Sequence, residues 1–300
     1  MRHSRSVRIL FSLLFLIVIL SNSPIASGKT VTGDKSHLEI SVSIPPMAWI
    51  VEGLLKGSDF EINVVLPPGK SPATYDPTPK EIATLQEANI YFMIGLPFEK
   101  ALIDKNIPNL PIRDCTRGIE LRLIEGGHDH GDKGEHFDPH VWLDPVNVKI
   151  IADDMMASFA KLALASDNRV IADNYDSVKA RLDTLNNQIA KIIDPYRGDT
   201  IFVFHPAFGY FTDRYGLYQV AIEKEGHEPS GKHLADLVDQ VKKSGARAIF
   251  VQPEFSDKAA RAIADELKIK IVYLDPLVRD YPNNMLKIAQ AIADAMKAKY

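Results

Sequence analysis

Hydrophobic residues along this chain are arranged in short apolar runs that alternate with stretches of helical periodicity. Six runs rich in Ile, Val, Phe and Leu have the length and composition of β-strands: residues 39–44, 60–66, 90–94, 201–204, 248–251 and 271–274. Alternating strand and helix signals are typical of parallel sheets. We therefore expect an α/β fold with mostly parallel sheets flanked by helices.

Helix starts are marked by capping signals. Residues 78–81, Thr-Pro-Lys-Glu, combine a capping box with proline at the first helical position, and Asp144 before Pro145 repeats the cap-and-proline pattern. From Tyr175 to Ile192, apolar residues recur at spacings of three and four, which predicts one long amphipathic helix. Its central position favours a connector between two lobes over a helix packed on a single core.

The first residues have the order of a secretory signal peptide. A segment with three arginines precedes an apolar run at residues 9–20, and small residues follow. The run is shorter than the ~20 residues that cross a bilayer, so a cleaved leader is favoured over a membrane anchor. We expect a signal peptide over 1–27, an N-terminal lobe over 37–170, a connecting helix over 171–195 and a C-terminal lobe over 198–300.

Charge and cysteine content narrow the function. The formal charge is −4, and loss of the three leader arginines would make it −7. An acidic chain without basic clusters argues against a nucleic-acid partner. Cys115, the single cysteine, can form no internal disulfide, and no cysteine stands at the leader's end to carry a lipid. We therefore expect an unanchored, exported protein of the periplasm.

Histidines are concentrated in one segment. His128, His130, His136 and His140 fall within thirteen residues that also contain aspartates and glycines. Such a tract is typical of a solvated loop, either without a role or with loose metal binding. His140 differs, because the apolar residues 141–143 and the cap at Asp144 follow it directly and would hold its side chain in place.

Three polar residues follow strands of the second half. His205, Gln252 and Asp275 each come directly after a predicted strand and are followed at once or one residue later by proline. Alone, such a histidine is usually structural, and Asp before Pro is usually a turn former. Since ligands bind at the carboxyl ends of parallel strands, three polar residues at equivalent strand ends predict a shared crevice.

The residue types indicate which ligand this crevice would hold. Imidazoles with one carboxylate suit zinc, with manganese or iron as alternatives, whereas calcium and magnesium prefer oxygen ligands throughout. Glycine-rich phosphate loops and a nucleophile elbow are absent from the sequence. The sequence therefore points to a transition-metal site.

Four ordered motifs then identify a family resemblance. They are LPPG with YDPTP at residues 66–79, DPHVWLDP at 138–145, FHPAFGYF at 204–211 and LDPL at 274–277. Together they resemble the zinc/manganese solute-binding proteins of ABC transporters over essentially the whole chain after the leader. The histidine-rich segment before the second motif is also similar to that of zinc-uptake members.

The resemblance implies two lobes joined by one long helix, with a metal ion between them that is delivered to a membrane permease. It carries over His140, His205 and Asp275 as metal ligands, and implies a transport protein, expected as a monomer, rather than an enzyme. The histidine of the first motif is replaced by Ala73. Water, His136 or Glu254 are the candidates for this open position.

Two other functions also fit three ligands and an open position. A two-histidine-one-carboxylate metalloenzyme has the same donor set, although no general base is evident in the sequence. A binding protein for a non-metal solute is the second alternative.

Overall fold

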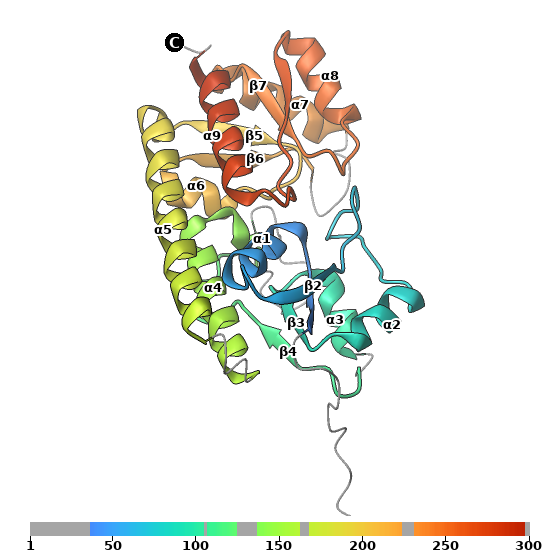
Figure 1. Cartoon of the computed structure of the whole chain (residues 1–300). Coiled ribbons are helices and arrows are strands. Elements are labelled where there is room, and N and C mark those ends of the chain that lie inside the picture. Colours follow the sequence, from blue (N-terminus) through green and yellow to red (C-terminus); the bar gives the residue numbers. More distant parts are fainter. Residues whose placement is uncertain (1–36, 105–106, 125–136, 163–167, 224–230, 298–300) are drawn as a thin grey trace, which may run out of the picture. The chain divides into compact units, whose positions relative to one another are not determined.

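A computed structural model describes residues 37–104, 107–124, 137–162, 168–223 and 231–297. The predicted signal peptide and His128, His130 and His136 lie outside these described residues. The described part contains two four-stranded parallel sheets and a set of long helices (Figure 1). The α/β fold class and the parallel sheets are thus confirmed, and each of the six predicted strands ends within two residues of its predicted end.

The first sheet is formed by the N-terminal half of the chain. Its strands have the order β2-β1-β3-β4: β1 His37–Val42, β2 Asp59–Val64, β3 Ile90–Met93 and β4 Ile112–Asp114. Successive strands are connected through α1 Pro45–Leu54, α2 Pro79–Glu87 and α3 Pro97–Asp104. The predicted capping box is present, since Thr78 and Glu81 exchange side-chain and backbone hydrogen bonds at the start of α2.

The second sheet repeats this topology. Its strand order is β6-β5-β7-β8: β5 Thr200–Val203, β6 Tyr218–Ala221, β7 Ala248–Val251 and β8 Lys270–Tyr273. The intervening helices are α6 Gly209–Tyr215, α7 Gly231–Ser244 and α8 Lys258–Leu267. In each sheet the first strand of the half lies second in spatial order, so both sheets reverse their winding there, which is where α/β sheets place their ligands.

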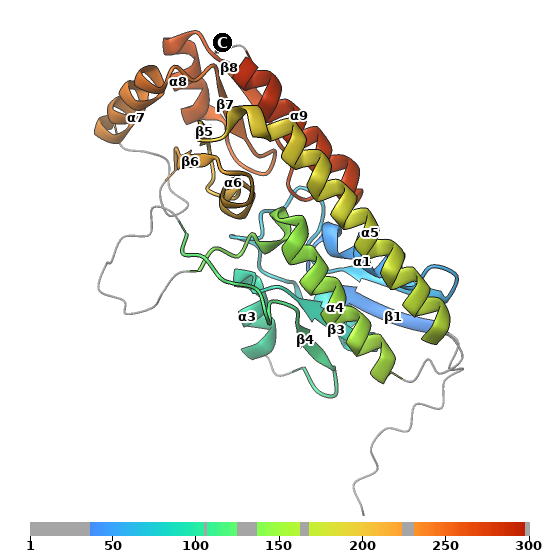
Figure 2. The same ribbon diagram turned by 90° about the vertical axis from the view of Figure 1, so that its left-hand side faces the viewer.

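Three helices run alongside one another outside the sheets (Figure 2): α4 Pro145–Lys161, α5 Asn168–Ile193 and α9 Tyr281–Lys297. The long connecting helix is confirmed as α5, which continues into a 3₁₀ turn, η2 Asp194–Tyr196. Its predicted apolar face is buried at Val178, Leu182, Leu185 and Ile189. The last helix returns along α5, so side chains of both halves share one core.

Two short strands, β4 and β6, were not predicted. Both are edge strands of three or four residues. Tyr218 at the start of β6 is 65% exposed, so no continuous apolar run marks it. Cys115 is a fully buried free cysteine. In the described part of the chain, no helix has both the length and the apolar character needed to cross a bilayer.

Candidate metal centre

His140 is held by a rigid segment on its C-terminal side. It precedes a 3₁₀ turn, η1 Val141–Leu143, whose three side chains are buried. The Trp142 indole N–H donates to the Pro276 carbonyl at 2.9 Å, and the Tyr281 hydroxyl donates to the Trp142 carbonyl at 2.9 Å. These bonds anchor the turn to the second half of the chain. His140 itself is 6% exposed.

A buried carboxylate orients the His140 ring. Asp138 Oδ1 accepts from His140 Nδ1 at 2.7 Å and from the His140 backbone N–H at 3.0 Å. Burial would raise the pKa of Asp138, but the hydrogen bonds and charge of His140 and the hydrogen bond from Arg122 outweigh it and lower that pKa. Because an ionised carboxylate only accepts, Nδ1 carries a proton, so in the neutral ring Nε2 is the nitrogen with the lone pair for a ligand.

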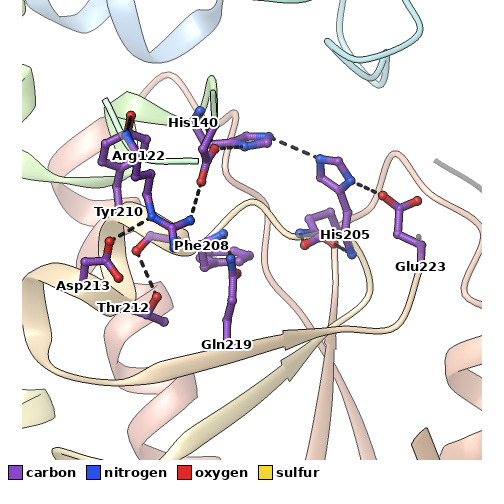
Figure 3. Close-up of polar contacts among 12 residues, drawn as sticks. Arg122, His140, His205, Phe208, Tyr210, Thr212, Asp213, Gln219 and Glu223 are labelled. Carbon is purple, nitrogen blue, oxygen red and sulfur yellow. Dashed lines mark hydrogen bonds and ion pairs between the residues drawn. The ribbon is translucent and has the colours of Figure 1, made fainter. Parts of the chain in front are cut away.

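The carboxylate of Asp138 is in turn held by Arg122, which also contacts the second half of the chain. Arg122 Nη1 donates to Asp138 Oδ2 at 2.9 Å, and Arg122 Nε donates to Asp213 of α6 at 2.8 Å (Figure 3). The Arg122 backbone N–H donates to the Tyr210 hydroxyl at 3.2 Å. The brace of His140 therefore crosses from one half of the chain to the other.

His205 is braced by residues of the second sheet. Its Nδ1 lies 2.5 Å from Glu223 Oε1, and its ring stacks on Phe255 with ring centroids 4.6 Å apart. Burial lowers the pKa of His205 below its usual value of 6.5, against the hydrogen bond of Glu223, which raises it. The imidazole is thus kept neutral with Nδ1–H directed at Glu223, the protonation state that binds metals.

Gln252 does not face the crevice with the two histidines, contrary to the expectation from sequence. Its side chain is fully buried and bonds both backbone groups of His205, accepting from the N–H at 3.2 Å and donating to the carbonyl at 2.8 Å. An amide can satisfy both groups at once, which explains a polar residue at this strand end.

The two imidazoles meet in the middle of the site. His140 Nε2 lies 3.3 Å from His205 Nε2 (Figure 3). With both Nδ1 atoms donating to carboxylates, the neutral rings would direct two lone pairs at each other, an arrangement that favours an electron-pair acceptor between them. Two Zn–N bonds of about 2.0–2.1 Å at the tetrahedral angle place their nitrogens roughly 3.3–3.4 Å apart. The observed spacing therefore matches one edge of a tetrahedral zinc site.

An open pocket of about 230 Å³ adjoins the two rings. Its lining includes both histidines, Ala73 from the first motif, Glu254 after β7, and Pro276 with Leu277. Asp275 directly precedes these last two residues, but its Oδ1 accepts from the Leu277 backbone N–H at 2.8 Å and it does not line the pocket. Among the described residues, no three His, Cys, Asp or Glu side chains are close enough together to hold a metal.

The structure thus brings together two of the three predicted ligands. The sequence predicted neither of the two carboxylates that brace the imidazoles. Glu223 follows the unpredicted strand β6 and has no sequence signal, whereas Asp138 stands in a recognised motif two residues before His140. Residues 125–136, with three of the clustered histidines, lie outside the described residues, but the residues on both sides of them are paired. Leu123 and Phe137 form an antiparallel bridge, and the Asp138 N–H donates to the Arg122 carbonyl at 2.9 Å.

Two parallel α/β sheets linked by a long helix, with two carboxylate-braced imidazoles facing each other, define the class of metal-binding solute-binding proteins. The chain belongs to the family described as zinc-uptake complex component A, periplasmic, whose sequence profile matches residues 40–295. It is thus the solute-binding component of a metal-transporting ABC system and not an enzyme, which removes the metalloenzyme alternative.

Individual relatives agree with this assignment. The chain is 26% identical over 321 residues to the high-affinity zinc uptake system protein ZnuA of Brucella abortus (strain 2308), covering 90% of this chain and 93% of that one. A crystal structure of ZnuA superposes with a TM-score of 0.80 at 33% identity, over 86% of this chain and 99% of that chain. A zinc-bound ZnuA deletion mutant gives 0.79 at 34% identity, over 86% and 98%.

Proposed function

We propose that this chain captures one Zn²⁺ between His140 and His205, with Asp275 as a carboxylate ligand, and delivers it to the permease of its transporter. The observation that supports this most is the pair of Nε2 atoms 3.3 Å apart, each on a ring whose Nδ1 is bound to a carboxylate. Two imidazoles favour zinc over manganese, since oxygen-rich sites suit the harder ion.

Asp275 needs a small rearrangement to join the metal. Its segment already borders the pocket through Pro276 and Leu277, and its Oδ1 accepts one backbone hydrogen bond. Oδ2 is the oxygen that a change in side-chain rotamer would direct toward the imidazoles. Binding of the ion would supply the energy for this change, because a carboxylate near a divalent cation gains more than it loses from a shifted rotamer.

The cellular setting follows from the same role. We propose that residues 1–27 are removed on export and that the mature chain works as a periplasmic monomer. The lobes 37–170 and 198–300 would hold the ion where both reach it, with residues 171–195 as their connection. Members of the family are periplasmic or lipid-anchored, and this chain has no cysteine at the end of its leader.

A zinc titration against a competing chelator tests the proposal. His140→Ala and His205→Ala should each weaken binding by more than about a hundredfold, since loss of a residue that only orients a ligand already costs roughly 10–100-fold. His37→Ala is the matched control, because this exposed histidine pairs with Asp59 at the start of β1, away from the pocket. If His205→Ala bound zinc as tightly as the parent, a different site would be indicated. If the parent itself bound no metal, a non-metal solute would be indicated.

A further inference from the structure

Glu254 lines the same pocket as the two histidines from the side of the second sheet. It lies three residues after the end of β7, in a turn closed by a hydrogen bond from the Phe255 N–H to the Gln252 carbonyl at 3.2 Å. Phe255 stacks on the His205 ring, so the neighbour of Glu254 is packed against a proposed metal ligand. The backbone of Glu254 is therefore fixed relative to His205.

The carboxyl group of Glu254 has no cationic partner among the described residues. Within the described ranges, neither Glu254 nor Asp275 forms an ion pair with a lysine, arginine or histidine. Burial, with a smaller contribution from the nearby charge of Asp275, raises the pKa of Glu254 to about 7. Two neighbouring carboxyl groups in a half-buried pocket, without a counter-charge from the described residues, are stabilised by a bound cation.

On the first-motif side the pocket is lined by Ser71, Pro72 and Ala73, none of which carries an imidazole or a carboxylate. The Ser71 hydroxyl accepts a hydrogen bond from the Ala73 backbone N–H at 3.3 Å, and the methyl group of Ala73 has no donor atom. A zinc ion held by two neutral imidazoles and Asp275 alone would keep a net positive charge in a partly buried site, which is costly. A second carboxylate would neutralise the ion and complete four-coordination.

We propose that Glu254 is a ligand of the bound metal, so that the site consists of two imidazoles and two carboxylates, with Glu254 in place of the absent first-motif imidazole. This inference rests on the proposed metal site at His140 and His205. It places three of four ligands in the second half of the chain. The additional oxygen makes the donor set harder, so discrimination of zinc against manganese should be weaker than with three imidazoles.

A loss-of-ligand experiment compares Glu254→Gln with Glu266→Gln, an exposed glutamate on α8 of the same half. In zinc titrations against a chelator, Glu254→Gln should bind at least tenfold more weakly. Loss of a residue that only supports a ligand already costs roughly 10–100-fold in affinity, and loss of a ligand should cost no less. Glu266→Gln should match the parent. If Glu254→Gln kept parental affinity while His205→Ala lost it, the inference would be wrong and the proposed function would stand. Retained binding in both variants would overturn both.

A gain-of-ligand experiment avoids any effect of lost stability. X-ray absorption at the zinc edge counts imidazole ligands from their multiple scattering. The zinc-loaded parent should show two imidazoles, and Glu254→His should show three, with a larger ratio of zinc to manganese affinity. Two imidazoles in the variant would mean that residue 254 does not reach the metal, which would contradict the inference even if Glu254→Gln binds weakly.

Discussion

The two histidines face one pocket but are held in different ways. His205 takes its support from its own sheet: Glu223, Gln252 and Phe255 all lie at the ends of the strands around it. His140 takes its support from Asp138, and Asp138 depends on Arg122, which also pairs with Asp213 of α6. One ligand is therefore fixed within a lobe and the other by contacts between the two halves.

This difference separates two tasks. A side chain braced within its own sheet stays in position whatever the other half does, so His205, as a proposed ligand, is suited to retain the proposed ion. A ligand braced across the halves keeps its geometry only while α6 and the segment around Arg122 remain in contact. We infer that loosening this contact would misplace His140 before it affects His205.

The largest expected effect is that of Asp138→Asn compared with Glu223→Gln. Each removes the carboxylate that fixes an imidazole, and such losses cost roughly 10–100-fold in metal affinity. Asp138→Asn should lie at the upper end of this range. It should also destabilise the apo protein by up to roughly 3 kcal/mol, because Arg122 then loses a buried carboxylate partner. Chelator-competition titration and denaturant unfolding measure both. A larger loss in Glu223→Gln would contradict the comparison.

Gly209→Ala should disturb His140 without touching a proposed ligand. A Cβ atom at this position would lie 1.6 Å from Arg122 Nη1, 2.4 Å from Arg122 Cζ and 2.7 Å from Asp138 Oδ2, so the guanidinium must move. We expect zinc affinity to fall by about tenfold, the lower end of the effects of supporting residues. Gly231→Ala is the control, since no atom of the described residues lies within 4 Å of its added Cβ. Equal affinities in the two variants would show that Arg122 does not position His140.

The pH dependence of apo stability should separate two groups of the pocket. Burial lowers the pKa of His205, so below pH ~6.5 this group binds more protons in the unfolded chain than in the folded chain. Its contribution to stability is therefore present above pH ~6.5 and is lost as pH falls. Burial raises the pKa of Glu254 to about 7, so its contribution runs the other way and is lost as pH rises from ~4.5 to ~7. Glu254→Gln should therefore make stability rise more steeply with pH, and His205→Asn less steeply. Melting temperatures of apo protein between about pH 5 and pH 8 measure these slopes, and unchanged slopes would contradict the assignments.

The smallest expected effect is that of Ala73→His, which restores an imidazole on the first-motif side. With Glu254 as the fourth ligand, this variant should tighten zinc binding by less than about tenfold, because four-coordination is already complete. The gain should shrink below pH ~6.5, where free imidazole is protonated. A much larger gain in chelator-competition titrations would show that the metal-coordination position beside Ala73 is open in the parent.

Most of the architecture was accessible from the sequence. Apolar runs predicted six strands, and the recurrence from Tyr175 to Ile192 predicted α5, because burial imposes these periodicities directly. The one buried residue of the short edge strand β6 is Gln219, which is polar. No run of apolar residues therefore marks this strand in the sequence. Missing β6 also concealed Glu223, which follows it.

The candidate site was accessible only in part. His140 and His205 stand in recognisable motifs, and the structure brings their Nε2 atoms together. Gln252 has the same position after a strand as His205, yet its side chain turns to the His205 backbone, which spacing alone does not reveal. The bond between Arg122 and Asp138 depends on how the chain on both sides of residues 125–136 is paired, and no local pattern encodes that.

Crystals of the zinc-loaded protein, with anomalous scattering recorded at the zinc edge, test the central claim most directly. We predict one strong zinc peak bonded to both His140 Nε2 and His205 Nε2 at about 2.0–2.1 Å, with the Nδ1 atoms still directed at Asp138 and Glu223. A zinc ion bonded through Nδ1 of either ring, or a peak only outside the pocket with the two imidazoles still 3.3 Å apart, would contradict it.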